Sequence, residues 1–196
     1  MRTLGVVLAA GEGRRMGVPK ALLRTADGTS WAARAGGVLL AGGCTEVVVS
    51  VGAQAAAVRA TLPAEVGALD VADWSLGQGR GIVRAIDHAR FTDADALLLT
   101  LVDLPDVVAA HIEAVLANVS PDALVRAGTP GRGGHPVVLG RQHFGRAREL
   151  AADGSGLKAL FSGGGAQVRW VALDGSRRDV DEPGQLPTGT RWPSNP

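Results

Sequence analysis

The sequence predicts an α/β fold in which helices cover both faces of a mostly parallel sheet. Apolar runs of strand length occur at residues 4–8, 46–51, 69–72 and 96–102, and segments with helical patterning separate them. The run at 46–51 is β-branched and apolar on both faces, which is typical of a central strand in a parallel sheet. Strands that alternate with helices form βαβ units, so we expect a three-layer α/β/α arrangement.

The helices are predicted from caps and apolar spacing. Thr29 or Ser30 can cap a helix that runs to Leu40 and ends at Gly42-Gly43. A helix over 106–119 would place its apolar residues, Val108, Ile112, Val115, Leu116 and Val119, on one face. Further helices are expected over residues 54–62, 81–89, 141–151 and 156–161.

The second half of the chain departs from this alternation. Short strands at 124–127 and 135–139 flank a glycine-rich connection, which suggests an edge or added part of the sheet that faces a ligand. A late strand is expected at 166–173. The length suits a single domain, expected over 1–186, and the three prolines of residues 187–196 indicate a flexible C-terminal tail.

Composition excludes several classes of protein. Lys and Arg number 20 against 19 Asp and Glu, so the net charge of +1 lacks the basic field typical of nucleic-acid binding. The single Cys44 cannot form an internal disulfide, and no apolar run reaches membrane-spanning length. Because no signal-peptide pattern precedes the first strand, we expect a cytoplasmic protein without nucleic-acid or membrane partners.

The loop from Leu8 to Lys20 is the strongest functional signal. It combines three glycines with Arg14, Arg15 and Lys20. Glycine lets backbone N–H groups face an anion, and Arg15 and Lys20 supply positive charge to a polyphosphate. The P-loop motif is absent because Ala21 follows Lys20, and the glycine spacing does not match the dinucleotide-binding fingerprint. The alternative is a glycine-rich turn with surface arginines.

Carboxylates follow two of the other predicted strands. Ligands of open parallel sheets bind beyond the carboxyl ends of the strands. Asp103 ends the most apolar strand and is either a metal ligand or a helix N-cap, but Asp106 can already cap the next helix. Asp179 and Asp181 lie on the same side of an extended stretch. One of them, with Asp103, can hold Mg²⁺, unless the pair is a solvated acidic turn.

Polar and aromatic side chains near the strand ends complete the candidate site. Residues 73–81 hold three glycines before a helix, and Gln78 among them can contact a base edge. Trp74 either covers a ligand or packs against the protein. His135 follows Gly134 at a strand entrance, where it either holds a second substrate or serves the turn.

Together these motifs resemble the nucleotidyltransferase superfamily, most closely the molybdenum cofactor cytidylyltransferase family. The matching pieces are Leu8-Ala9-Ala10-Gly11-x-Gly13-x-Arg15-Met16-Gly17-x-Pro19-Lys20-Ala21-Leu22-Leu23, Trp74 with Gly77 and Gly79, Asp103-x-Pro105, Gly134-His135-Pro136-Val137 and Asp179-Val180-Asp181-x-Pro183. They occur in the family's order over nearly the whole chain.

The resemblance implies a Rossmann-like sheet of the nucleotide-diphospho-sugar transferase type and a nucleotidyltransferase reaction. A substrate phosphate would attack the α-phosphorus of an NTP and release pyrophosphate. Arg15 would bind the β- and γ-phosphates, Lys20 would stabilise charge at the α-phosphate, and Asp103 with Asp181 would hold Mg²⁺; the catalytic set is Arg15, Lys20 and Asp103. The implied nucleotide-binding residues are Leu8, Ala9, Ala10, Gly11, Gly13, Arg15, Lys20, Gly77, Gln78, Gly79 and Asp103. The implied acceptor-binding residues are Trp74, Gly134 and His135.

The resemblance also gives expectations for the substrates. Leu-Ala-Ala-Gly resembles the cytidylyl enzymes, whereas guanylyl relatives tend to carry Leu-Ala-Gly-Gly, so CTP is favoured over GTP. Molybdopterin is the expected acceptor, and a molybdoenzyme or its chaperone is a possible partner. Leu104, Gly81-Ile82 and the segment 153–158 depart from the family's pattern. Alternatives are a guanylyl- or sugar-phosphate nucleotidyltransferase and a catalytically silent nucleotide-binding or cofactor-chaperone protein.

Overall fold

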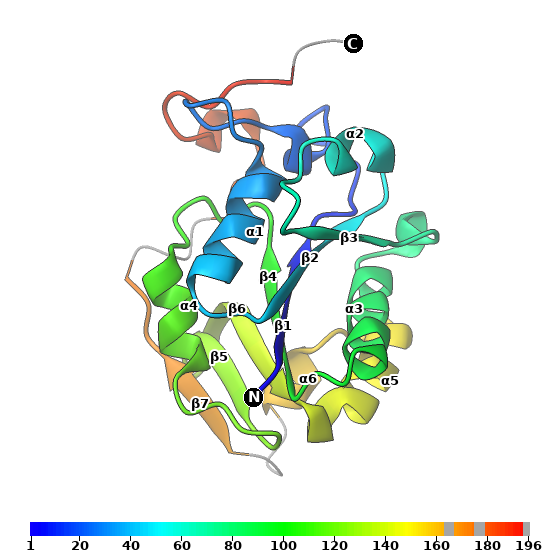
Figure 1. The fold of residues 1–196 in the computed structure, drawn as a ribbon, viewed down its shortest axis with the longest axis vertical. Helices are drawn as coiled ribbons and strands as arrows, with labels where there is room; N and C mark the ends of the chain where they lie inside the picture. The colour runs from blue at the N-terminus through cyan, green and yellow to red at the C-terminus, as the bar shows by residue number, and fades with distance from the viewer. Residues whose placement is uncertain (163–166, 175–178, 194–196) are drawn as a thin grey trace.

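The computed structural model describes residues 1–162, 167–174 and 179–193 (Figure 1). The strands are β1 (Thr3–Leu8), β2 (Glu46–Val51), β3 (Gly67–Asp70), β4 (Ala96–Leu101), β5 (Leu124–Thr129), β6 (Arg132–Gly140) and β7 (Val168–Val171). The α-helices are α1 (Trp31–Ala41), α2 (Ala55–Arg59), α3 (Gly79–Phe91), α4 (Ala109–Leu116), α5 (Phe144–Ala152) and α6 (Lys158–Ser162). Short 3-10 helices are η1 (Lys20–Leu22), η2 (Trp74–Leu76), η3 (Arg141–His143) and η4 (Pro183–Gln185).

Within the described ranges, seven strands form one sheet in the order β3-β2-β1-β4-β6-β5-β7. β1 pairs parallel with β2 and β4, β2 with β3, and β5 with β7. Only β6 runs antiparallel to its neighbours, β4 and β5, among the strands described. The predicted α/β class with a mostly parallel sheet is confirmed.

Helices cover both faces of the sheet (Figure 1). Successive side chains of a strand point to opposite faces of the sheet, so each central strand contributes to a hydrophobic cluster on both faces. Val7 and Leu98 pack in the cluster that contains the inner faces of α1 and α4. Val6 and Leu97 pack in the second cluster, with α3 and α5. This burial on both faces holds the central strands rigid, so residues at their ends have fixed positions.

The helix expected over 106–119 is shorter than predicted. The Val107 N–H donates to the Leu104 carbonyl (3.2 Å), and this turn buries both side chains in the core. The chain therefore enters α4 only after Val108, which precedes Ala109 in an extended conformation. The expectation that Asp106 caps this helix is wrong. Val108, expected on the apolar face, is exposed instead.

Other elements also differ from their expected bounds: β3 begins two residues before the expected 69–72, and α5 and α6 are shorter than the expected 141–151 and 156–161. The helix expected over 54–62 is only the short α2, whereas α3 begins two residues before and ends two residues after the expected 81–89. A Cβ at Gly79, the first residue of α3, would lie 2.3 Å from the Ala151 carbonyl oxygen. Its missing side chain lets the start of α3 approach the end of α5.

The hairpin of β5 and β6 lies inside the sheet rather than at an edge, which β7 forms. The strands are longer than the expected 124–127 and 135–139, and the pairing register shifts between Arg126 and Gly128. Gly128 has φ +119°, and the place of its missing Cβ is taken by the Arg132 carbonyl oxygen at 2.5 Å. Because β6 is antiparallel to β4, its first residues reach the carboxyl end of β4. Residue 166 of the expected late strand lies outside the described residues.

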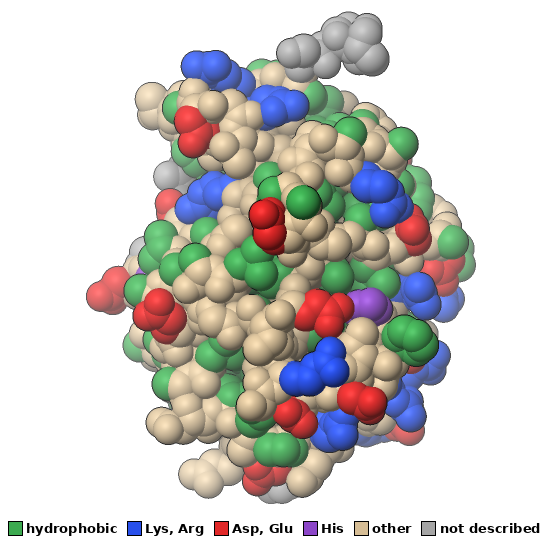
Figure 2. Space-filling model, viewed as in Figure 1, with side chains coloured by type: hydrophobic (Ala, Val, Ile, Leu, Met, Phe, Trp, Pro, Cys, Tyr) green, Lys and Arg blue, Asp and Glu red, His purple; other side chains and the backbone are tan. Residues whose placement is uncertain are grey.

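The described part of the C-terminal segment contacts the body of the protein. Arg191 exchanges two backbone hydrogen bonds with Arg24, of 2.9 and 2.8 Å. Residues 194–196 of the expected tail lie outside the described residues. None of the helices described is both long and apolar enough to cross a membrane. On the face drawn in Figure 2, basic and acidic side chains are interspersed.

Candidate functional site

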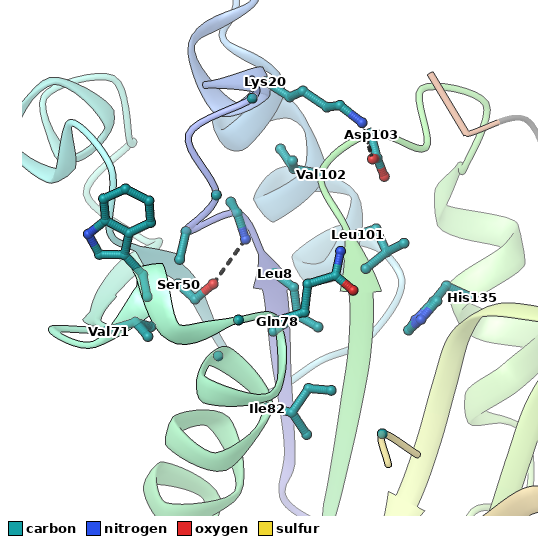
Figure 3. Close-up of a pocket in the computed structure, with 18 of the residues that line it drawn as sticks. Leu8, Lys20, Ser50, Val71, Gln78, Ile82, Leu101, Val102, Asp103 and His135 are labelled. Atoms are coloured by element: carbon teal, nitrogen blue, oxygen red, sulfur yellow. Dashed lines mark hydrogen bonds and ion pairs between the residues drawn. The ribbon is translucent and has the colours of Figure 1, made fainter. Parts of the chain in front are cut away.

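One cavity of about 730 Å³ opens beyond the carboxyl ends of β1, β3 and β4 (Figure 3). We call the loop of residues 8–20 with Asp103 and Asp181 the loop side of this cavity. Arg126, His135, Lys158 and Phe161 form the hairpin side. This end of the sheet is where ligands of open α/β folds bind, because strand ends and loops converge there on a rigid support.

Hydrogen bonds hold the loop after β1 in place. The Ala9 N–H donates to the buried Ser50 Oγ on β2 (2.9 Å; Figure 3), and the Ala53 N–H donates to the Ala10 carbonyl (2.9 Å). Gly13 has φ +67°, and a Cβ there would lie 2.0 Å from the Val18 carbonyl oxygen. Only glycine fits this turn. The loop is thereby ordered around the open space of the cavity.

Lys20 joins the two carboxylates expected to bind a metal. Its Nζ lies 2.7 Å from Asp103 Oδ2 and 2.8 Å from Asp181 Oδ1. Arg15 reaches the same Asp181 oxygen at 3.3 Å. Figure 3 shows the lysine side chain extending from η1 toward Asp103 at the end of β4. The Val180 N–H donates to the Asp103 carbonyl (3.1 Å), which positions Asp181 beside β4.

The charges in this cluster stabilise one another. Burial by itself would lower the pKa of Lys20, but hydrogen bonds to Asp103 and Asp181 outweigh it and raise that pKa above its ordinary value. The hydrogen bond and charge of Lys20 lower the pKa of Asp181. Lys20 is therefore an ammonium and Asp181 a carboxylate at neutral pH.

The carboxylates suit a hard divalent cation. Asp103 Oδ1 is buried without a hydrogen-bond partner, so it has a lone pair available to a ligand. Mg²⁺ is usually bound by one or two carboxylates together with substrate phosphates and water. No group of three or more His, Cys, Asp or Glu of metal-binding geometry occurs among the residues described. Asp103 and Asp181 thus fit a metal that substrate oxygens help to hold.

Asp179 and Asp181 have different surroundings. Asp181 faces Lys20, whereas Asp179 is exposed and its charge acts to raise the pKa of His135. Val180 between them is buried. Of the two carboxylates, Asp181 is therefore the one beside Asp103.

His135 lies on the opposite wall of the cavity from Gln78 (Figure 3). Its Nδ1 lies 3.3 Å from the Leu99 carbonyl oxygen. Burial lowers the pKa of His135, and nearby Arg126 acts in the same direction. A neutral ring that donates from Nδ1 to this carbonyl has Nε2 available as a hydrogen-bond acceptor.

The segment after β3 forms another wall. Gln78 directs its amide toward Leu101 in Figure 3, across the cavity. Gly77 has φ +125°, which favours glycine. Trp74 borders the cavity and also packs closely over Gly52, where a Cβ would lie 2.6 Å from its ring. Trp74 therefore packs against the protein and also presents a surface to the cavity.

The structure brings most of the predicted site residues to one cavity. Its wall includes Leu8, Ala9, Ala10, Gly11, Gly13, Arg15, Lys20, Trp74, Gly77, Gln78, Asp103, His135 and Asp181. Gly79 and Gly134 are not in the wall. Gly79 allows α3 to pack against α5 instead.

Ser50, Arg126 and Phe161 also line the wall, although the sequence did not predict them as site residues. Ser50 and Arg126 had a detectable signal, because each places a polar side chain within an otherwise apolar strand. Phe161 had no such signal, since it reaches the cavity only through the packing of α6, whereas Lys158 ends the segment 153–158 that departs from the family's pattern.

Comparison with known proteins agrees with this geometry. Residues 5–169 match the model of the MobA-like NTP transferase domain. The chain belongs to this family. It is a nucleotidyltransferase by that membership, and the resemblance seen in the sequence is confirmed.

Two curated relatives carry different names. Nicotine blue oxidoreductase of Paenarthrobacter nicotinovorans is 37% identical over 144 residues, which are 69% of each chain. A probable molybdenum cofactor guanylyltransferase of Rhodopirellula baltica is 36% identical over 104 residues, 53% of this chain and 49% of that protein.

Solved structures give the same fold. Rv0371c of Mycobacterium tuberculosis H37Rv superposes with a TM-score of 0.76 at 29% identity, covering 94% of this chain and 95% of that one. A manganese complex of the same protein superposes with a TM-score of 0.68 at 26% identity, covering 89% of each chain. That relative therefore binds a divalent cation on this fold.

Proposed function

We propose that this nucleotidyltransferase joins CMP from CTP to a small phosphorylated acceptor, a molybdopterin or its metal-loaded form, with Mg²⁺ and release of pyrophosphate. One observation carries the proposal: Lys20, at the end of the glycine-rich loop, lies 2.7 and 2.8 Å from Asp103 and Asp181 in one cavity. Residues suited to a triphosphate and residues suited to its metal are thus adjacent.

The residues of the loop side suit an in-line transfer. An oxygen of the acceptor phosphate attacks the α-phosphorus, a new P–O bond forms, and the bond to the β-phosphate oxygen breaks. In this proposal Lys20 stabilises charge at the α-phosphate and Arg15 binds the β- and γ-phosphates. A Mg²⁺ ion held by Asp103 and Asp181 supplies further positive charge when it is bound. Positioning and charge stabilisation account for most of the catalysis of such transfers.

The nucleotide preference rests on Ala10. Its carbonyl already accepts the Ala53 N–H, so the backbone at this position is fixed. A methyl group here, where guanylyl relatives tend to have glycine, leaves less room for a purine and favours cytosine. Ala10→Gly is expected to raise the use of GTP relative to CTP.

The acceptor in this proposal contacts Trp74 and His135, whereas Gly134, which was also expected to contact it, is absent from the cavity wall. His135 supports this assignment, because it borders the cavity and its burial favours a neutral ring. We further propose that the product passes to a molybdoenzyme or its chaperone in the cytoplasm.

Pyrophosphate release tests the proposal. Each NTP is incubated with Mg²⁺ or Mn²⁺, with and without molybdopterin and other phosphorylated acceptors. We expect turnover with CTP and molybdopterin. Faster turnover with GTP, or with a sugar phosphate as acceptor, would change the proposed substrates but leave the proposed nucleotidyl transfer in place. NTP binding without turnover would favour a silent binding protein. Because one relative is named an oxidoreductase, consumption of NADH and NADPH is measured in parallel.

A further inference from the structure

Arg126, on the hairpin side of the cavity, is held between two aromatic rings. Its guanidinium carbon lies 5.1 Å from the ring centroid of Phe161 and 5.9 Å from that of Trp170. Its Nη2 also donates to the Gly133 carbonyl at 3.2 Å. Cation–π contacts on a planar guanidinium restrict its orientation. Residues of β5, β6, α6 and β7 thus fix one side chain.

Gly133 makes room for this arrangement. A Cβ at Gly133 would lie 2.3 Å from Arg126 Nε and 2.7 Å from the Trp170 ring. Any larger residue would displace the guanidinium or the indole. Gly134 next to it has no atom within 4 Å of its missing Cβ. The close fit is therefore specific to the glycine beneath Arg126.

Arg126 has no carboxylate partner within the described ranges, although it is partly buried. Its Nε is buried and makes no hydrogen bond. Burial lowers the pKa of Arg126, which means that its charge is poorly solvated. Arg148 shows the usual alternative, two hydrogen bonds to the carboxylate of Asp87. A guanidinium with unused donors at a cavity wall suits an anionic ligand.

Arg126, His135 and Asp103 line the same cavity. The charges of both Arg126 and Asp103 affect the pKa of His135, so the three groups are close together. Lys158 adds a second cation to the same wall and forms no ion pair among the described residues. On the loop side, by contrast, Lys20 and Arg15 both pair with carboxylates. The cations without a carboxylate partner among the described residues therefore lie on the hairpin side of the cavity.

We infer that Arg126 binds an anionic group of the acceptor, separate from the phosphate that attacks the nucleotide. The acceptor class is then a compound with two anionic groups, one at Lys20 and the other at Arg126. This inference rests on the proposed function for the placement of the attacking phosphate. Phe161, Trp170 and Gly133 position Arg126 for that contact.

Inorganic phosphate tests anion binding without a nucleotide. The signal of the shielded Arg126 Nε–H is followed by NMR during a phosphate titration and assigned by its loss in Arg126→Lys. We expect a saturable shift of this signal. Arg146, exposed and paired with Glu149 on α5, is the matched control. A shift confined to the Arg15 signal, or no shift at Arg126, would overturn the inference.

Steady-state kinetics with the acceptor found by the pyrophosphate assay give a second readout. Arg126→Met should raise the KM for the acceptor about 10- to 100-fold, as expected for loss of a charged hydrogen bond, and leave the KM for the NTP unchanged. Arg146→Met should change neither. An unchanged acceptor KM in a folded Arg126→Met would overturn the inference while the proposed function stands. A phosphate-induced shift of the Arg126 Nε–H signal without any NTP turnover would support the anion site and refute the proposed function.

Discussion

The two sides of the cavity are built in different ways. The loop side consists largely of backbone from one continuous segment, and its cations are neutralised by Asp103 and Asp181. The hairpin side consists of side chains from β5, β6 and α6, and Arg126 there lacks a carboxylate partner in the described part of the chain. The loop side thus suits a metal-bound triphosphate, whereas the hairpin side suits a ligand that brings its own negative charge.

The largest effect is expected from a substitution of Lys20, because it removes a central cation of the loop side. Lys20→Ala should lower kcat about 100-fold or more, by analogy with the loss of one transition-state donor. The measurement is initial pyrophosphate release with saturating substrates, with circular dichroism to check the fold. Arg146→Ala is the control, because Arg146 is exposed, pairs with Glu149 on α5 and does not line the cavity. An unchanged kcat would remove Lys20 from catalysis.

A second substitution separates the two C-terminal carboxylates. Asp181→Asn should raise the Mg²⁺ concentration needed for half-maximal activity at least about 10-fold, since even outer ligands of metal sites have effects of that size. Asp179→Asn is matched in chemistry and exposed, and it should leave the Mg²⁺ dependence unchanged. If Asp179→Asn has the larger effect, the metal ligand is Asp179.

The hairpin side is tested by a pair of neighbouring glycines. Gly133→Ala should displace Arg126 or Trp170 and raise the acceptor KM about 10-fold, the value of one hydrogen bond to a charged group. Gly134→Ala has free space and should behave like the wild type. The KM for the NTP should stay constant in both variants. Equal effects of the two substitutions would show that the close fit at Gly133 does not matter for the acceptor.

The smallest effect is a pH dependence of stability from His135. Burial lowers its pKa in the folded state, so below pH of about 6.5 the unfolded chain binds a proton that the folded chain does not. As the pH is lowered below this value, the free energy of unfolding should fall by at most about 1.4 kcal/mol per pH unit. Urea unfolding between pH 8 and pH 5 measures this, and His135→Asn should reduce the slope. The other three histidines are present in both the wild type and the variant, so they do not contribute to the difference in slope. Identical slopes would mean that His135 titrates normally.

Local sequence patterns were sufficient to predict β1, β2, β4 and α1 in the first half of the fold. β1, β2 and β4 are apolar runs whose burial on both faces is visible in composition, and Ser30 caps α1 through its hydroxyl as expected. The start of α4 depends on the burial of Leu104 and Val107 against distant elements, which residue preferences do not reveal.

The same contrast applies to the site. The loop of residues 8–20 was predictable because its glycines and cations are contiguous. The surroundings of Arg126 were not, because they come from Gly133, Phe161 and Trp170 on three other elements. The position of β6 within the sheet likewise results from long-range pairing with β4.

The contact between Lys20 and Asp181 has a consequence for the synthesis of the protein. It joins positions 161 residues apart, so the cluster cannot form before Asp181 has been synthesised. A nascent polypeptide that ends before residue 179 contains all the sheet strands described but neither Asp179 nor Asp181. Such a fragment contains Asp103 but lacks Asp181, one of the two carboxylates suited to a metal. Competence for metal binding would therefore arise only after residue 181 has been synthesised.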